Sequence, residues 1–155
     1  MWKETLKVRL FGLTKVPLIH WVRPRVVELS DDVAEIAIPL KRRNKNHLGS
    51  MYFGVLGVGA DLGGGLLALA AMERARKKGH KISLVFKDVE GRFLRRPTGT
   101  THFRCEQGPE VAALVDEAIE TGERVNLPLK ITATVPKEGP EPVAEYVLTL
   151  SLKKR

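Results

Sequence analysis

One carboxylate, Asp61, lies inside a glycine-rich apolar run of this 155-residue chain, NKNHLGSMYFGVLGVGADLGGG at positions 44–65. A carboxylate in apolar surroundings is costly unless it is paired or used, so Asp61 is the first candidate for chemistry. It could serve as a general base or as a nucleophile. The alternative is a structural aspartate paired with a nearby Arg or Ser. We favour the functional interpretation, because a structural pair would leave the surrounding glycines unexplained.

The small residues of this run follow helical spacing. Positions 54, 57, 61, 64 and 68 share one helix face, and they hold Gly54, Gly57, Asp61, Gly64 and Ala68. Each glycine inside a helix costs about 1 kcal/mol relative to alanine, and close approach of a backbone or ligand is the usual reason to accept that cost. The pattern predicts a buried helix over about 53–77, with Asp61 in a small-walled gap that a ligand can enter.

A membrane-spanning helix is the other interpretation of this run. The segment 51–72 has the length of a span and only one charge. However, a central Asp costs roughly 2.5–3.5 kcal/mol on membrane-insertion scales, and glycines add little hydrophobicity. We therefore expect a helix buried inside a protein core, and no membrane partner.

Alternating apolar residues predict strands before and after this helix. They lie at about 25–29, 33–40, 80–94, 98–107, 124–136 and 142–154. The first two would form a hairpin around Ser30, and the Glu-Gly pair at 90–91 predicts a bulge or a bend. A second helix is expected at about 109–121, and one or two short helices within 1–22. The order predicts an α+β fold in one domain, 1–155, with a single antiparallel sheet around one long helix.

The overall charge is +8 with an isoelectric point near 9.8, which favours polyanionic partners. The basic residues are scattered and no nucleic-acid-binding motif accompanies them, so we expect no nucleic-acid partner. A single cysteine, Cys105, allows no internal disulfide and is expected to be inert packing in a cytoplasmic protein. As a nucleophile it would need His102 or His47 as a base. The histidines have no metal-ligand spacing, so no metal is expected.

The stretch NHLGSMYFGVLGVGAD resembles the signature of hotdog-fold acyl-CoA thioesterases of the phenylacetyl-CoA type. That signature is Asn, two residues, Gly, two residues, His-Gly-Gly, then six residues to an Asp or Glu. Asn46, Gly49, Gly54 and Asp61 match it without gaps, and a looser resemblance covers about 24–152. The segment 93–99 is similar to the strand that follows the hotdog helix. The helix at 109–121 points to a thioesterase-like branch whose function is unassigned.

The resemblance implies a hotdog fold, a curved six-stranded antiparallel sheet wrapped around a central helix. It also implies a homodimer with two sites per pair, and leaves open a dimer of dimers. The implied substrate is an acyl-CoA or similar thioester, with coenzyme A as part of the substrate and no other cofactor.

The resemblance also assigns roles to individual residues. The Gly54 N–H would polarise the thioester carbonyl, Asn46 would orient water or that carbonyl, and Asp61 would act as base or nucleophile. The partner subunit's helix N-terminus would complete each site. Four further residues are expected to line the substrate: Gly49, Tyr52, Phe53 and Gly57.

Two departures from the signature leave alternatives open. The family's His falls on Tyr52 and the first Gly of its pair on Phe53, and Tyr carries no charge at neutral pH. A non-catalytic module that binds an acyl group or acyl-CoA, or that only dimerises, is therefore the second hypothesis. Asn46 could instead be a loop or helix-capping residue. Basic residues at 41–45 or 95–96 could meet CoA phosphates or simply form a solvated basic face.

Overall fold

The computed structural model describes all 155 residues, and its elements follow the predicted order. The helices are α1 (Trp2–Lys15), α2 (Pro17–Val22), α3 (Phe53–Lys77) and α4 (Gly108–Thr121), with a short 3-10 turn η1 (Arg42–Asn44). The strands are β1 (Arg25–Leu29), β2 (Ala34–Ile38), β3 (Ile82–Phe93), β4 (Thr101–Cys105), β5 (Arg124–Thr134) and β6 (Pro142–Lys154).

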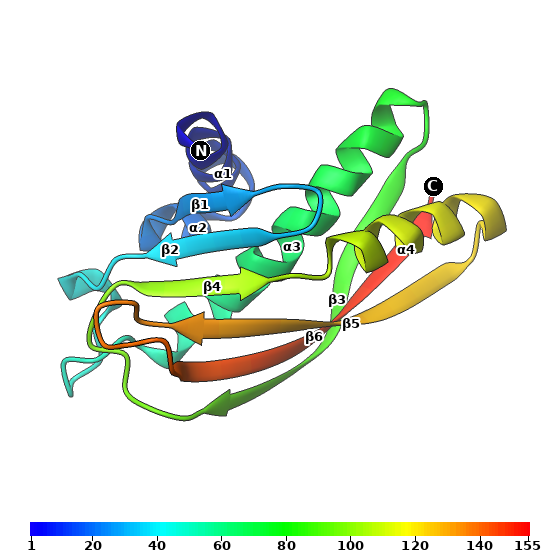
Figure 1. Cartoon of the computed structure of the whole chain (residues 1–155). Coiled ribbons are helices and arrows are strands. Elements are labelled where there is room, and N and C mark those ends of the chain that lie inside the picture. The colour runs from blue at the N-terminus through cyan, green and yellow to red at the C-terminus, as the bar shows by residue number, and fades with distance from the viewer.

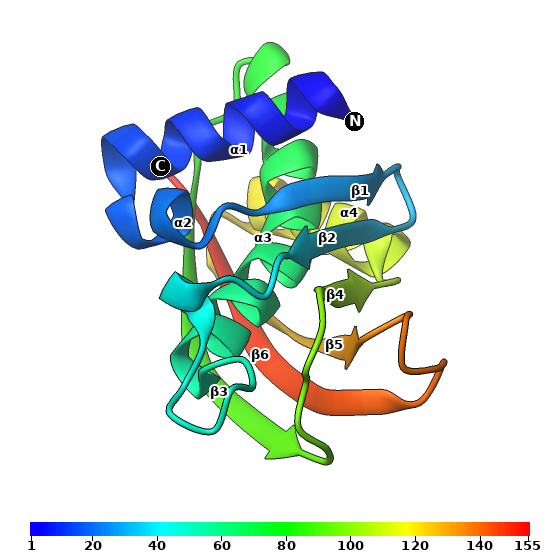
Figure 2. The ribbon, with the colours of Figure 1, turned by 90° about the vertical axis from the view of Figure 1, so that its left-hand side faces the viewer.

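The six strands form one antiparallel sheet in the order β1-β2-β4-β5-β6-β3. The sheet curves around α3, which crosses its concave side, and α4 packs beside the C-terminal half of α3 (Figure 1). The helices α1 and α2 cover the end of the molecule near β1 and α3 (Figure 2). This confirms the hotdog architecture, in which one sheet and one central helix enclose a common core.

The central helix α3 begins at Phe53 and ends at Lys77, as predicted. It is long and apolar enough to cross a membrane, but 67% of its most apolar window is buried inside the fold. It is therefore a core helix. Basic residues in its last turn, among them Arg74 and Arg76, interact favourably with the negative end of the helix dipole.

Three glycines of α3 let the helix approach the sheet closely, and the third, Gly64, would place a Cβ 3.1 Å from Cδ1 of Leu129 on β5. A Cβ at Gly59 would overlap the ring of Phe103, a fully buried residue of β4. A Cβ at Gly63 would lie 3.2 Å from Cγ2 of Ile131 on β5, which is tighter than ordinary van der Waals contact. Gly57, in contrast, has no heavy atom within 4 Å of such a Cβ.

The predicted small-residue stripe was therefore only partly right. Gly54, Gly57 and Asp61 lie on the more open side of α3, whereas Gly64 and Ala68 are buried. Gly64 does approach the sheet closely, but Gly59 and Gly63, which do so as well, were outside the predicted stripe. A helix that is apolar on every side has no hydrophobic asymmetry to show which face meets the sheet.

Two smaller expectations were also wrong. The β3–β6 register shifts between Phe86 and Val89, not at the Glu-Gly pair of 90–91. Position 91 needs a glycine for another reason, because a Cβ there would lie 2.7 Å from Cε1 of the Tyr146 ring. The strand expected at 98–107 is shorter, because pairing with β2 begins at Thr101.

We expect Gly59→Ala to lower the free energy of unfolding by about 1–3 kcal/mol, because the added methyl group forces Phe103 or the helix to move. Gly57→Ala is the matched control, and it should be neutral or stabilising by up to about 1 kcal/mol. Urea denaturation of both variants measures the difference. Equal stabilities would contradict the role assigned to Gly59.

Candidate functional site

The direction of Asp61 follows from the glycines that face the sheet. Asp61 lies two residues after Gly59 and two before Gly63, and two residues turn an α-helix by about 200°. Because both glycines contact the sheet, the Asp61 side chain points to the other side of α3. There it lines a cavity of about 590 Å³ between α3, the N-terminal helices, β1 and β3.

The walls of this cavity are mainly large apolar side chains. They include Val8, Phe11, Ile19, Leu66, Leu84 and Phe86. The expected small-walled gap is therefore corrected to an apolar pocket, in which Gly65 and Ala70 of α3 lie among larger side chains. Charged residues of α1 and α3, such as Lys7, Glu73 and Lys77, also line it.

Asp61 makes no hydrogen bond and no ion pair, and burial alone raises the pKa of its carboxyl group. The structural alternative, a pair with a local Arg or Ser, is not found. The lowered hydration and the absent partner together make the ionised carboxylate a stronger base than an exposed Asp.

The N-terminus of α3 offers unpaired backbone donors. Tyr52 donates its N–H to the carbonyl oxygen of Asn44 (2.8 Å), and the N–H groups of Val55 and Leu56 bond to the Tyr52 carbonyl. The N–H groups of Phe53 and Gly54 have no partner, and no side chain caps the helix. Such groups, with the positive helix dipole, are suited to a negatively charged oxygen.

The aromatic pair Tyr52 and Phe53 stands at this helix end. Their ring centroids are 4.8 Å apart. Tyr52 is 47% exposed to solvent and Phe53 is 62% exposed. The Tyr52 ring lies over Gly54, where a Cβ would be 2.8 Å from its Cε1. The Tyr52 ring thus covers one side of Gly54.

Asn46 organises the loop before the helix. Its Oδ1 accepts hydrogen bonds from the N–H groups of Leu48 (2.9 Å) and Ser50 (3.2 Å), and its Nδ2 donates to Ser50 Oγ (3.0 Å). Gly49 supplies the positive φ of 80° that this loop needs. These contacts agree with the interpretation of Asn46 as a loop residue. They engage both Oδ1 and Nδ2, so the side chain is not free to take part in the reaction.

Asn44 is a positioning residue that the sequence reasoning missed. It is fully buried, and its Nδ2 donates to the carbonyl oxygens of Val22 (3.2 Å) and Pro39 (2.8 Å). Its backbone carbonyl accepts the Tyr52 N–H, so one residue joins α2, the end of β2 and the start of α3. Its Oδ1 has no partner. Nothing in the sequence separates Asn44 from Asn46, since both are Asn residues in the same basic loop.

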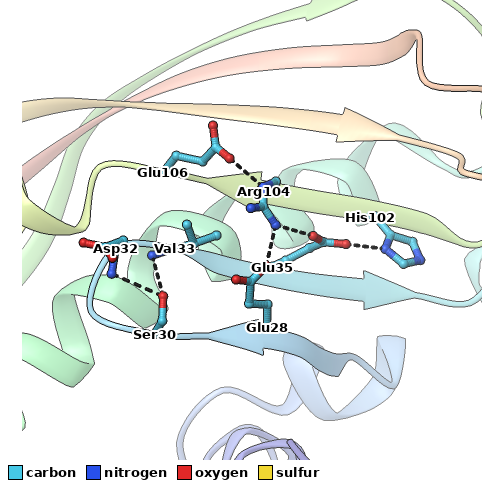
Figure 3. A network of polar contacts seen from close by, with 8 residues as sticks. All are labelled: Glu28, Ser30, Asp32, Val33, Glu35, His102, Arg104 and Glu106. Atoms are coloured by element: carbon cyan, nitrogen blue, oxygen red, sulfur yellow. Dashed lines mark hydrogen bonds and ion pairs between the residues drawn. The ribbon is translucent and has the colours of Figure 1, made fainter.

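A second polar cluster lies on the outer face of the sheet (Figure 3). Arg104 on β4 binds Glu28 on β1 (2.6 Å), Glu35 on β2 (2.7 Å) and Glu106 (2.8 Å), and Glu35 also bonds to His102 Nδ1 (2.6 Å). Burial raises the pKa of Glu35, but the hydrogen bonds from His102 and Arg104 outweigh it and hold the pKa below its usual value. These residues face one another in the strand register, so the cluster stabilises the pairing of β1, β2 and β4.

The remaining sequence candidates lie apart from Asp61. Cys105 is buried in the core, where desolvation raises the pKa of its thiol. Residues 102 and 105 point to opposite faces of β4, so His102 is no base partner for it. The structure contains no cluster of three or more His, Cys, Asp or Glu side chains that could hold a metal ion.

The fold is shared with solved structures of thioesterases. A Pseudomonas aeruginosa protein of unknown function, named a probable thioesterase, is 26% identical (TM-score 0.79; 97% of this chain and 96% of that one). A Haemophilus influenzae thioesterase is 16% identical (TM-score 0.62; 92% and 87%). Another Pseudomonas aeruginosa thioesterase is 14% identical (TM-score 0.67; 97% and 94%).

Sequence comparison places the chain in a family. No curated protein matches it. The sequence profile of a domain of unknown function, DUF4442, matches residues 6–150, which is nearly the whole chain. The chain therefore belongs to the DUF4442 family and has a thioesterase-like hotdog fold.

Proposed function

We propose that this protein hydrolyses an acyl thioester, with Asp61 as general base or nucleophile and the Gly54 N–H as the group that polarises the carbonyl. The observation that carries the proposal is the unpaired Asp61 carboxylate on the wall of an apolar cavity of about 590 Å³. The likeness to a probable thioesterase over 97% of the chain supports the same reaction class.

The chemistry suits these groups. The acyl chain would lie in the apolar cavity, and Asp61 would take a proton from a water molecule as its oxygen attacks the thioester carbonyl carbon. The carbon–sulfur bond then breaks, Asp61 gives its proton to the leaving sulfur, and a carboxylic acid and a free thiol leave. As a nucleophile, Asp61 would instead form an acyl anhydride with release of the thiol, and water would then hydrolyse it.

The proposal requires two subunits. Gly54 and Asp61 are seven residues apart on α3, about 10 Å along the helix axis, and the Asp61 cavity is not lined by Gly54. In a homodimer the carbonyl-polarising N–H would come from the partner subunit's helix. The long edge strand β3 supports such pairing, because its outer edge is unpaired and it exposes Val85, Val89 and Phe93.

The second candidate is a non-catalytic acyl-binding module. It is favoured by the aromatic pair Tyr52 and Phe53, which replaces His-Gly and sets the Tyr52 ring against Gly54. Such a module would keep the apolar cavity and the dimer but release no thiol. The two candidates therefore differ in turnover alone.

We expect Asp61→Asn to lower thioester hydrolysis by about 10²–10⁴-fold, since it removes the proton acceptor without changing size. Release of free thiol from a panel of acyl-CoAs of different chain lengths measures this, and circular dichroism checks the fold. Thiol release at an unchanged rate would remove Asp61 from the mechanism. Acyl-CoA binding without turnover in the unmodified protein would favour the binding module.

The same substitution should increase stability at neutral pH. Burial raises the pKa of Asp61 in the folded state, so its protonated form is favoured there. The contribution of Asp61 to the stability of the unmodified protein is fully present below the unfolded-state pKa. It is lost as the pH rises through the raised folded-state pKa. Asp61→Asn lacks this loss, so its advantage should grow from pH 4 to pH 7. Urea unfolding at several pH values tests it, with exposed Asp116→Asn as the charge-matched control.

We expect the protein to be a dimer through β3. Light scattering should give about twice the chain mass, and Val89→Lys should shift the equilibrium toward the monomer by burying a charge in the interface. Val27→Lys on β1, the opposite edge strand, is the matched control and should leave the dimer intact. Dissociation by the control, or none by Val89→Lys, would place the interface elsewhere.

A further inference from the structure

A strongly basic hollow lies between α2 and η1, apart from the Asp61 cavity. Its volume is about 810 Å³. It is lined by seven residues, Trp21, Arg23, Pro39, Lys41, Arg42, Arg43 and Asn44. Four of them are cations and none is a carboxylate. None of the four cations forms a salt bridge, unlike Arg104, which contacts three carboxylates. The charge of the hollow is therefore uncompensated within the chain.

The hollow combines cationic donors with an aromatic face. The guanidinium carbon of Arg43 lies 5.2 Å from the Trp21 ring centroid, and Arg43 Nη1 donates to the Trp21 carbonyl (3.4 Å). The Trp21 residue is still 57% exposed. The side chains of Lys41 and Arg42 make no hydrogen bond and are exposed. Planar donors that match phosphate oxygens thus stand beside a surface on which a planar base can stack.

The positions of these residues are set by the fold. Arg23 ends α2 with a positive φ of 58°, an uncommon conformation for a residue other than glycine. Asn44 holds η1 against α2 through its bonds to Val22 and Pro39. The donors therefore project from two anchored segments.

The hollow is connected directly to the N-terminus of α3. Asn44, which lines the hollow, accepts the N–H of Tyr52, and Gly54 follows two residues later. A ligand with an anionic end in the hollow can extend a flexible arm toward the Gly54 N–H. The other basic candidate is less available, because the Arg95 guanidinium already binds the carbonyl oxygens of Glu141 and Pro142.

We propose that this hollow binds the phosphate-bearing nucleotide end of coenzyme A, with the adenine against Trp21 and the phosphates on Arg23, Lys41 and Arg42. The proposal rests on the proposed function, because it names the thiol half of the thioester substrate. Charge-assisted bonds from several cations to phosphate oxygens are strong and directional. They would anchor the substrate by its nucleotide while the acyl group occupies the Asp61 cavity.

Direct binding tests the hollow without any turnover. In a Trp2→Phe background Trp21 is the only tryptophan, so its fluorescence reports the hollow. CoA and adenosine 3′,5′-bisphosphate should quench it, with inorganic phosphate as a weak competitor. The double variant Lys41→Ala/Arg42→Ala should weaken CoA binding by about tenfold or more, and Lys137→Ala/Lys153→Ala, which removes the same charge elsewhere, should not. Equal CoA affinity in both double variants, or no CoA binding at all, would overturn the inference.

Kinetics separate this inference from the proposed function. For an acyl-CoA, the Lys41→Ala/Arg42→Ala variant should raise KM by about tenfold and leave kcat unchanged. For the same acyl group on N-acetylcysteamine, which has no nucleotide, both constants should stay the same. Turnover of the short thioester without CoA binding would overturn the inference and keep the hydrolase. CoA binding in the hollow without turnover of any thioester would keep the inference and overturn the hydrolase.

Discussion

The close contact between α3 and the sheet is the constraint on which the rest of the molecule depends. The helix is apolar on all sides, so burial favours contact on every face and hydrophobicity alone does not fix its rotation. The missing side chains of Gly59, Gly63 and Gly64 remove that freedom, because they allow the helix to sit on Phe103, Leu129 and Ile131. Once they face the sheet, Asp61 must face away from it.

This rotation links packing to chemistry. The carboxylate is moved out of the dense core and into a cavity bounded by the N-terminal helices and β3. It is still desolvated enough for its pKa to be raised, but no partner neutralises it. A residue that costs stability in its ionised form and has no structural partner is typical of a functional site. The N-terminal helices matter for the same reason, because without α1 one wall of the cavity would be missing.

Charge is distributed unevenly between the outer face of the sheet and the basic hollow between α2 and η1. On the outer sheet face, three carboxylates surround the single guanidinium of Arg104, so acidic groups outnumber basic ones there (Figure 3). Between α2 and η1, four cations have no acidic neighbour in the hollow. The net charge of +8 is thus partly concentrated beside the start of α3. Asn44 connects that basic hollow to the helix end, so the two regions share one rigid support.

The sequence by itself determined the architecture and the position of the central helix. Periodicity is local information, so the bounds of α3 and the presence of six strands could be predicted from it. It also singled out Asp61, because a lone charge in an apolar run is visible without a structure. The match of Asn46, Gly49, Gly54 and Asp61 to the thioesterase signature indicated the hotdog fold, which the structure confirms.

Only the tertiary structure decided which face of the helix each residue occupies. The glycines that pack on the sheet, the unpartnered state of Asp61 and the role of Asn44 all depend on segments far apart in the chain. The basic hollow likewise joins Arg23 to residues 41–44, which no sequence window connects. The physical reason is that side-chain contacts between distant segments are set by how the helix and sheet pack, and local sequence patterns carry no record of that packing.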